Sequence, residues 1–160
     1  DLILKLSDIL RYLLYDGSEQ KVSLAQELKY VKSYLELEKV RHGSRMNLEI
    51  NIEGDTESKE IAPMLLIPFV ENSFKHGLGK DKDKGYVHLN VRAEKEELFF
   101  TIANSKPING IKVSRVKGYQ GGIGIINVKK RLNLLYPQKH KLEVTKDDRE
   151  FKVELNIKLI

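Results

Sequence analysis

The sequence of 160 residues contains no cysteine. This absence excludes disulfide bonds, cysteine–zinc sites and thiol catalysis, and it fits a reducing compartment. Long hydrophobic runs are also missing, since no stretch reaches the roughly 18 apolar residues that a membrane-spanning helix needs. Aromatic residues make up 8% of the chain and form no recognisable base-stacking motif, so we expect no nucleic-acid partner.

Charge, in contrast, is plentiful. Charged residues make up 32% of the chain, and the formal net charge is +5 at pH 7. Such a modest positive excess suits phosphate groups in general. The length suggests one domain with a real hydrophobic core. Because Asp1 runs directly into an apolar pattern, we expect the chain to be part of a longer protein.

Two helices are expected in the first quarter of the chain. Apolar residues recur at spacings of three and four over 2–15, which predicts an amphipathic helix. A second helix is predicted to follow Ser23, because Ser23 and Gln26 have the spacing of a capping box. This helix should run to about Arg41, with Gly43 as its C-cap.

Alternating apolar and polar residues predict strands in the rest of the chain. Four of these strands should form two antiparallel hairpins, with a helix that ends near Tyr136 between the hairpins. Because strands outnumber helices without regular alternation, we expect an α+β fold, a two-layer α/β sandwich. Its mixed, mostly antiparallel sheet would be covered by helices on one face. The predicted strands are 48–52, 86–91, 98–103, 142–145 and 151–159.

The stretch from Pro63 to Gly77 is predicted to form a helix that starts or kinks close to Pro68, because an internal proline removes a hydrogen bond. Projected at about 100° per residue, its side chains divide into an apolar arc and a polar arc. A polar arc on a helix packed into a core indicates a binding site. The apolar arc holds Leu66, Phe69, Val70 and Ser73, and the polar arc holds Asn72, Lys75 and His76, with Glu71 to one side.

A glycine cluster at 121–124 opens the next predicted helix. Glycines let backbone N–H groups approach a phosphate, and the helix N-terminus adds a favourable dipole. A Rossmann motif does not fit, because the cluster comes late and lacks the first-strand context. A Walker motif does not fit either, because no Gly-Lys-Ser/Thr sequence follows.

Between these two motifs, the strand 98–103 ends in a polar segment that contains Asn104 and Lys106. The segment 107–120 that follows has glycines, basic residues and few large apolar side chains. We interpret it as a mobile lid over phosphates, although an ordinary surface loop fits equally well. The cations of this lid that could reach anionic oxygens are Lys112, Arg115 and Lys117.

Together, the three motifs resemble those of a known family. Glu-Asn-Ser-Phe-Lys-His-Gly at 71–77 resembles the N box of the GHKL (Bergerat-fold) ATPases and kinases, in the form used by LytS-like sensor histidine kinases. The strand end at 101–107 stands in the place of the G1 box, and 121–132 resembles the G2 box and its helix. The resemblance covers nearly all the chain and implies a Bergerat-type sandwich that binds ATP and Mg²⁺.

The resemblance also assigns roles to single residues. Asn72 would be the Mg²⁺ ligand, a role that suits a hard oxygen donor. Asn104 replaces an aspartate that accepts a hydrogen bond from adenine, and the neutral amide should make that bond weaker. Lys106 replaces a glycine, and Glu71 could polarise the imidazole that receives the phosphoryl group. The other implied ATP-binding residues are Lys75, His76, Gly121, Gly122, Ile123, Gly124 and Ile125.

The two N-terminal helices resemble segments that follow the phosphoacceptor histidine in LytS-like kinases. We therefore divide the chain into a remnant of the dimerisation and phosphoacceptor region, 1–41, and an ATP-binding catalytic domain, 42–160. The acceptor histidine would lie upstream of Asp1, so the chain alone should bind ATP without phosphorylating itself.

For the parent protein, the resemblance implies a bacterial protein-histidine kinase of a two-component system, which transfers the γ-phosphoryl group of ATP to its histidine. It further implies a response regulator of the LytTR type as partner and a homodimer of the full-length protein. The chain itself would be a soluble, cytoplasmic part of a protein in the plasma membrane.

Two other functions stay open. A GHKL ATPase that drives a conformational cycle would carry a water-activating glutamate four residues before the asparagine. This chain has Pro68 there, which cannot act as a base. A degenerate module that binds partners but no nucleotide would fit the departures at Asn104 and Lys106.

Overall fold

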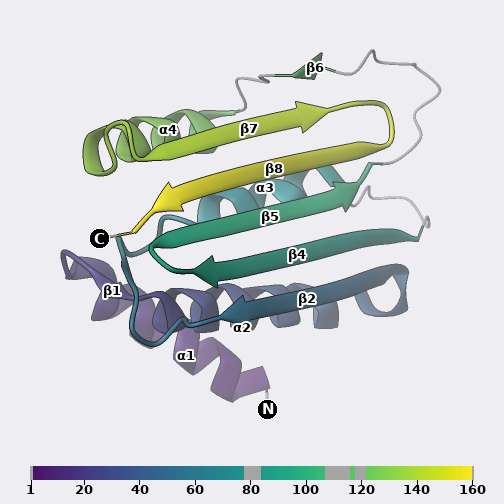
Figure 1. Cartoon of the computed structure of the whole chain (residues 1–160). Coiled ribbons are helices and arrows are strands. Elements are labelled where there is room, and N and C mark those ends of the chain that lie inside the picture. Colours follow the sequence, from purple (N-terminus) through teal and green to yellow (C-terminus); the bar gives the residue numbers. More distant parts are fainter. Residues whose placement is uncertain (1, 78–83, 107–115, 118–121, 160) are drawn as a thin grey trace.

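The computed structural model describes residues 2–77, 84–106, 116–117 and 122–159, with the backbone alone at 75–77 and 116–117. Helices α1 to α4 and strands β1 to β8 lie in these ranges (Figure 1). The helices are α1 (Leu2–Leu14), α2 (Leu24–His42), α3 (Ile67–Gly77) and α4 (Ile123–Leu135). The strands are β1 (Val22–Ser23), β2 (Met46–Gly54), β3 (Glu60–Ile61), β4 (Gly85–Glu94), β5 (Glu97–Ser105), β6 (Val116–Lys117), β7 (His140–Lys146) and β8 (Glu150–Lys158).

Six of these strands form one sheet in the order β2-β4-β5-β8-β7-β6. The pair β2–β4 is parallel, and every other neighbouring pair is antiparallel. The hairpins β4–β5 and β7–β8 are those that the alternating patterns predict. The mixed, mostly antiparallel sheet is therefore confirmed.

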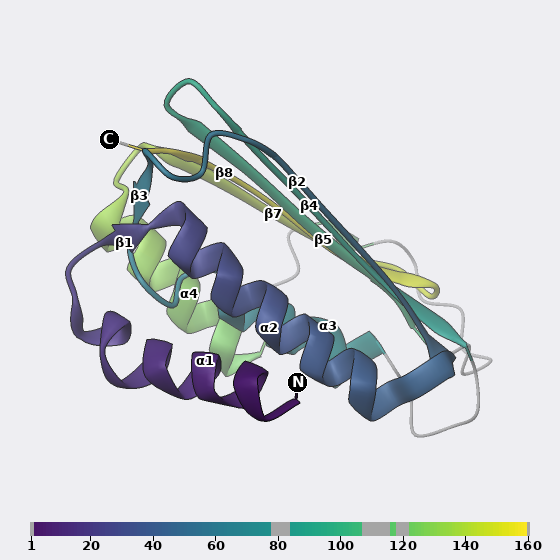
Figure 2. The same ribbon diagram turned by 90° about the horizontal axis from the view of Figure 1, so that it is seen from below.

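The helices lie on one face of the sheet, as Figure 2 shows. Helices α2, α3 and α4 lie next to the strands, and α1 packs on the far side of α2 (Figure 2). The predicted two-layer sandwich, covered on one face, is confirmed with α1 as an addition. None of the described helices is both long and apolar enough to cross a membrane.

The core forms where the apolar stripes of the helices meet the inner face of the sheet. Every second side chain of β5 is buried, from Leu98 to Asn104. One continuous hydrophobic cluster joins these strands to the apolar stripe of α2, which includes Leu28 and Leu35. Helix α2 thus packs into the same core as the sheet, and the division into 1–41 and 42–160 stays a prediction.

Local signals set the helix ends. The capping box of α2 is present, with Ser23 Oγ accepting from the backbone N–H of Gln26 at 3.1 Å. Gly43 follows as the C-cap with φ +60°, a conformation that favours glycine. Helix α3 begins at Ile67, so Pro68 lies in its first turn, where the missing N–H costs little. The predicted start close to Pro68 is confirmed.

The parallel pairing of β2 with β4 and the short sheet of β1 with β3 had no signal in the sequence. Gly54 ends the parallel pair at φ +89°, where a Cβ atom would lie 1.9 Å from the carbonyl oxygen of Ala93. Only glycine fits this close approach. The predicted lid, 107–120, lies outside the described residues except for β6, whose backbone pairs with β7.

Candidate functional site

Helix α3 carries four of the predicted site residues, Glu71, Asn72, Lys75 and His76, and is covered on several sides. It contacts β5 and β8 of the sheet, and helices α2 and α4 flank it. Phe69, Val70 and Ser73 of the predicted apolar arc are fully buried. The hydroxyl of Ser73 donates to the carbonyl oxygen of Phe69 at 3.1 Å, which satisfies it inside the core. The apolar arc is therefore confirmed.

Asn72 faces α4 and is buried with 6% of its surface exposed. Its Nδ2 donates to the carbonyl oxygen of Pro68 at 2.6 Å and lies 3.4 Å from where a Cβ atom at Gly124 would be. The amide oxygen, the only atom of this side chain that could coordinate a cation, is not used in that bond. The structure thus brings the predicted metal ligand next to the predicted glycine motif.

The glycine motif forms the start of α4. Gly122 is the N-cap, and its carbonyl oxygen accepts from the N–H of Ile126 at 3.1 Å. A Cβ atom at Gly122 would have no neighbour within 4 Å among the residues that the structure describes. Ile123 is 80% exposed and Ile125 is fully buried, so Ile125 anchors the first turn in the core. Gly121 lies outside the described residues.

Asn104 lies on the inner face of β5, fully buried, on the side that α3 and α4 cover. Its Nδ2 donates to the carbonyl oxygen of Ser105 at 3.1 Å, while its Oδ1 is buried and has no hydrogen-bond partner within the described part of the chain. A buried acceptor without a donor costs about 1–3 kcal/mol. A ligand with an amino group, such as adenine, would supply the missing donor.

Glu71 faces α2 instead of α4. Burial and the charge of Glu71 raise the pKa of Tyr30 in α2 to about 12. Burial, followed by the charges of Glu38 and Glu71, raises the pKa of Tyr34 to about 12. The charge of Glu71 therefore acts on α2, whereas Asn72 lies next to the start of α4. Lys75 and His76 lie in the C-terminal part of α3, and their side chains are outside the described part of the chain.

Lys106 is engaged with the turn between β7 and β8. Its ammonium donates to the carbonyl oxygen of Asp147 at 2.6 Å, and its backbone N–H donates to that of Arg149 at 2.7 Å. Burial and the nearby charge of Lys146 lower the pKa of Lys106. Lys112 and Arg115 lie outside the described residues, as does the side chain of Lys117.

Two residues near the site had no place in the sequence prediction. Glu27 of α2 is fully buried and accepts hydrogen bonds from the backbone of the turn that precedes α3. Burial raises the pKa of Glu27, although hydrogen bonds from Tyr12 and from that backbone oppose the shift. Arg131 of α4 donates to carbonyl oxygens of the same turn. A carboxylate between Leu24 and Leu28 on the apolar stripe was the signal that could have found Glu27.

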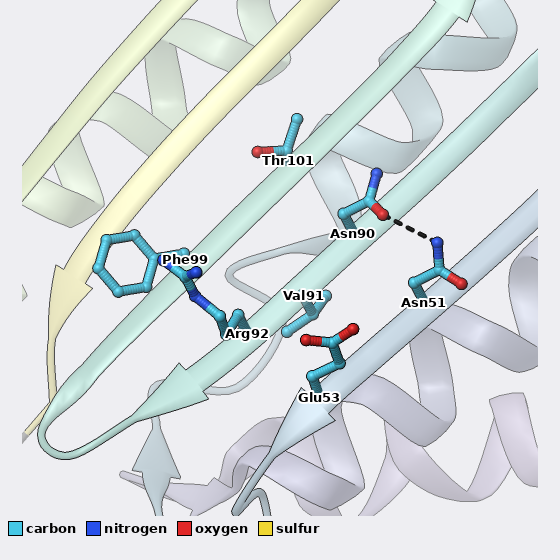
Figure 3. A pocket seen from close by; sticks show the side chains of 7 residues that line it. All are labelled: Asn51, Glu53, Asn90, Val91, Arg92, Phe99 and Thr101. Carbon is cyan, nitrogen blue, oxygen red and sulfur yellow. Dashed lines mark hydrogen bonds between the residues drawn. The ribbon is translucent and has the colours of Figure 1, made fainter.

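A shallow hollow exists on the opposite, uncovered face of the sheet (Figure 3). There Asn51 donates to Asn90 at 3.0 Å, and the Arg92 guanidinium lies 4.8 Å from the ring centre of Phe99. None of the predicted site residues lines this hollow, so it is separate from the site between α3 and α4. No cluster of three or more His, Asp or Glu side chains able to hold a metal occurs in the described ranges.

Comparison with known proteins adds sequence relatives. A family model described as "Histidine kinase" matches residues 1–46. The sensor protein LytS of Oceanobacillus iheyensis is 27% identical over 157 residues, which cover 92% of this chain and 27% of that protein. The sensor histidine kinase YpdA of Escherichia coli is 30% identical over 142 residues, which cover 84% of this chain and 24% of that protein. The chain spans about a quarter of the length of these relatives.

Solved structures share the fold. The catalytic domain of histidine kinase ThkA matches with a TM-score of 0.58 at 14% identity, covering 86% of this chain and 94% of that chain. Histidine kinase AdeS of Acinetobacter baumannii matches with a TM-score of 0.59 at 11% identity, over 98% of this chain and 76% of that one. Full-length ShkA in complex with AMPPNP matches with a TM-score of 0.59 at 14% identity, over 99% and 35%. At such identities the likeness concerns the fold alone.

Proposed function

Because the chain belongs to the LytS-like sensor histidine kinases in sequence and has the fold of a histidine kinase catalytic domain, we propose that it is the ATP-binding catalytic domain of such a kinase. The observation that carries this proposal is that the side-chain amide of Asn72 lies beside the start of α4, 3.4 Å from where a Cβ atom at Gly124 would be. This supports a site in which the oxygen of the same amide, a hard donor, serves Mg²⁺ beside a helix N-terminus whose N–H groups favour phosphate. Two motifs that are about 50 residues apart in sequence thereby form one site.

Each described residue of this site has a defined task in the proposal. The first turn of α4, from Gly122 to Ile125, binds phosphate oxygens through backbone N–H groups. Asn72 holds Mg²⁺ through Oδ1, and Mg²⁺ takes most of its other ligands from phosphate and water. Asn104 accepts a hydrogen bond from the adenine amino group through its unpaired Oδ1. Lys75 contacts the phosphate groups, and His76 lines the pocket.

The bound MgATP supplies the phosphoryl group, and the chain contributes positioning and charge neutralisation, which phosphoryl transfer chiefly requires. We propose that the acceptor is a histidine of the longer parent protein, outside this chain. Glu71 would polarise its imidazole from the α2 side of α3, where this carboxylate lies. Lys106 would have to leave the carbonyl oxygen of Asp147 before it could contact the nucleotide.

The setting of the domain follows from the same proposal. The parent would form a homodimer, pass its phosphoryl group to a response regulator of the LytTR type, and keep this domain on the cytoplasmic side of the plasma membrane. The relatives named sensor protein and sensor histidine kinase support this setting. ShkA, which shares the fold, was solved with the ATP analogue AMPPNP, and this supports the choice of nucleotide.

Calorimetric titration with a non-hydrolysable ATP analogue, with and without Mg²⁺, tests the proposal. The unmodified chain should bind, and Asn72→Ala should lose most of the Mg²⁺-dependent part of the affinity. Asn133→Ala, on the exposed face of α4, is the matched control and should bind like the unmodified chain. Absence of heat with the unmodified chain would favour a degenerate interaction module. Sustained phosphate release from ATP would favour a GHKL ATPase.

A further inference from the structure

The turn that precedes α3, residues 62–66, is held by side chains from other helices. Glu27 Oε2 accepts from the N–H of Met64 at 2.9 Å, and its Oε1 accepts from the N–H of Leu66 at 2.9 Å. From the other side, Arg131 donates to the carbonyl oxygens of Met64 at 3.0 Å and Pro63 at 2.9 Å. Glu27 in α2 and Arg131 in α4 thus bind the backbone of the same turn through charge-assisted hydrogen bonds.

The conformation of this turn depends on the hydrogen bonds with Glu27 and Arg131. Met64 has φ +56°, the left-handed region that side chains other than glycine rarely adopt. Such a conformation persists only where the surroundings over-determine it. A further side chain contributes, since the N–H of Ala62 donates to the hydroxyl of Tyr136 at 2.9 Å.

The turn at 62–66 also sets where α3 starts and therefore the position of Asn72. Leu66 directly precedes the helix, and its carbonyl oxygen accepts from the N–H of Phe69 at 3.2 Å. Asn72 lies one turn further on and donates to the carbonyl oxygen of Pro68 in the first turn. Since a helix moves nearly as a rigid body, a displaced turn carries Asn72 away from Gly124.

Helix α1 and the residues after it contact Glu27 and the turn before α3. Tyr12 is buried with 4% exposure, and its hydroxyl donates to Glu27 Oε2, the oxygen that also holds Met64. After α1, Gly17 packs so closely that a Cβ atom there would lie 3.1 Å from Met64 Sδ. The ion pairs between α1 and α2 are surface contacts by comparison, for example Lys5 with Glu36 at 3.2 Å.

We propose that Glu27 is a positioning residue for Asn72, and that Tyr12 makes this hold depend on the place of α1. The inference rests on the proposed function for its nucleotide readout, but the turn and Asn72 can be observed without nucleotide. When α1 shifts, Glu27 loses a donor and the turn loosens, and α3 no longer presents Asn72 to the start of α4.

Tyr12→Phe is the first variant. It removes both links from α1, the hydrogen bond that Tyr12 donates to Glu27 and the longer one, 3.4 Å, that it accepts from the N–H of Met64, and it leaves both backbone bonds to Glu27 possible. Tyr86→Phe is its matched control. It removes the hydrogen bond from the Tyr86 hydroxyl to the carboxylate of Glu150. Tyr86 lies in β4, outside helices α2, α3 and α4. Glu27→Gln is the second variant, because an amide offers one acceptor oxygen where two backbone N–H groups need one each.

Two measurements are made on each variant, under conditions where it is folded. The first is NMR on the nucleotide-free chain, following the backbone amides of Met64 and Leu66 and the side-chain amide of Asn72. Tyr12→Phe and Glu27→Gln should raise hydrogen exchange at the two backbone amides about tenfold or more and shift the Asn72 signal. The second is affinity for an Mg²⁺–ATP analogue, which should fall about three- to tenfold for Tyr12→Phe and further for Glu27→Gln.

Tyr86→Phe should change neither readout, although it too loses a hydrogen bond. If Tyr12→Phe and Glu27→Gln lower the melting temperature but match Tyr86→Phe in both readouts, Glu27 and Tyr12 are structural only and the inference is overturned. If the unmodified chain binds no nucleotide, the proposed function fails, and the NMR readout alone decides whether Tyr12 and Glu27 position Asn72.

Discussion

The side-chain amide nitrogen of Asn72 lies 3.4 Å from the position that a Cβ atom would occupy at Gly124. This distance is an ordinary van der Waals contact, so an added methyl group would touch Asn72 without forcing either helix to move. It would, however, fill the space between the candidate metal ligand and the start of α4. Folding and ligand binding should therefore respond to this substitution in opposite directions.

We accordingly expect Gly124→Ala to keep or raise the unfolding free energy, by up to about 1 kcal/mol, because alanine has the better helix propensity. Its affinity for an Mg²⁺–ATP analogue should fall about tenfold or more, since phosphate can no longer approach closely. Urea denaturation and calorimetry measure the two effects. A variant that loses stability and affinity together would show that the glycine serves packing only.

Replacing the neutral amide of Asn104 by a charged carboxylate provides a second test. Asn104→Asp should destabilise the nucleotide-free chain by about 1–3 kcal/mol, because a carboxylate oxygen replaces the amide that donates to the carbonyl oxygen of Ser105. The same charge should strengthen the hydrogen bond from adenine and raise ATP affinity several-fold. Thermal denaturation without nucleotide and titration with ATP and GTP test both parts. An equal response to ATP and GTP would argue against a contact with the base.

The titration of Glu27 should make the unfolding free energy depend on pH. Burial raises its pKa in the folded chain above the ordinary value of 4.5. Below about pH 4.5 the carboxyl is protonated in both states. As pH rises further, the unfolded chain releases the proton first, so the folded chain binds more protons and the unfolding free energy falls. This loss continues until the pH passes the pKa of the folded state.

Glu27→Gln cannot titrate, so the stability advantage of the unmodified chain over this variant should be largest below about pH 4.5. It should shrink with a slope of up to about 1.4 kcal/mol per pH unit as pH rises. Denaturation by urea from pH 4 to pH 8 measures the difference, with Glu57→Gln at an exposed site as control. A difference that stays constant with pH would contradict the assignment.

Arg131 is expected to stabilise the fold through geometry more than charge. Its guanidinium donates to the carbonyl oxygens of Pro63 and Met64 with two different nitrogens. Arg131→Lys keeps the charge but cannot match both bonds, so it should cost about 1–3 kcal/mol of unfolding free energy. Lys130→Ala, at the exposed neighbour, should stay within about 0.5 kcal/mol. Equal stability of the lysine variant and the unmodified chain would show that the charge alone suffices.

The inner face of α3 could be predicted from sequence, because burial of Leu66, Phe69 and Val70 follows from the helical period alone. The same period put Glu71 to one side of the polar arc that holds Asn72, but it could not tell which neighbouring helix each side meets. Which flank of a helix meets α2 and which meets α4 depends on elements that are distant in sequence. The resemblance of the motifs therefore predicted that Asn72 and Gly124 belong to one nucleotide site, but not that Glu71 lies toward α2.

Glu27 shows a second reason why the sequence could not predict the whole site. Its position on the apolar stripe of α2, between Leu24 and Val31, could have indicated a buried carboxylate, but the sequence prediction did not include one. Its partners, however, are backbone N–H groups of a turn almost 40 residues away, and no residue pattern encodes a backbone donor. The pairing of β2 with β4 escaped prediction for a similar reason, since alternation identifies a strand without identifying its neighbour.

The placement of α3 in the connection between β2 and β4 has a consequence for the order of folding. The hairpins β4–β5 and β7–β8 join sequence neighbours, whereas β2–β4 must close a long loop that contains α3. Ile102→Val in β5 should therefore slow folding, and Ile50→Val in β2 should mainly speed unfolding, which stopped-flow kinetics can resolve. On this pathway the helix that carries Asn72 is among the last to settle, so a newly made chain would gain its ligand affinity only after the edge strand has docked.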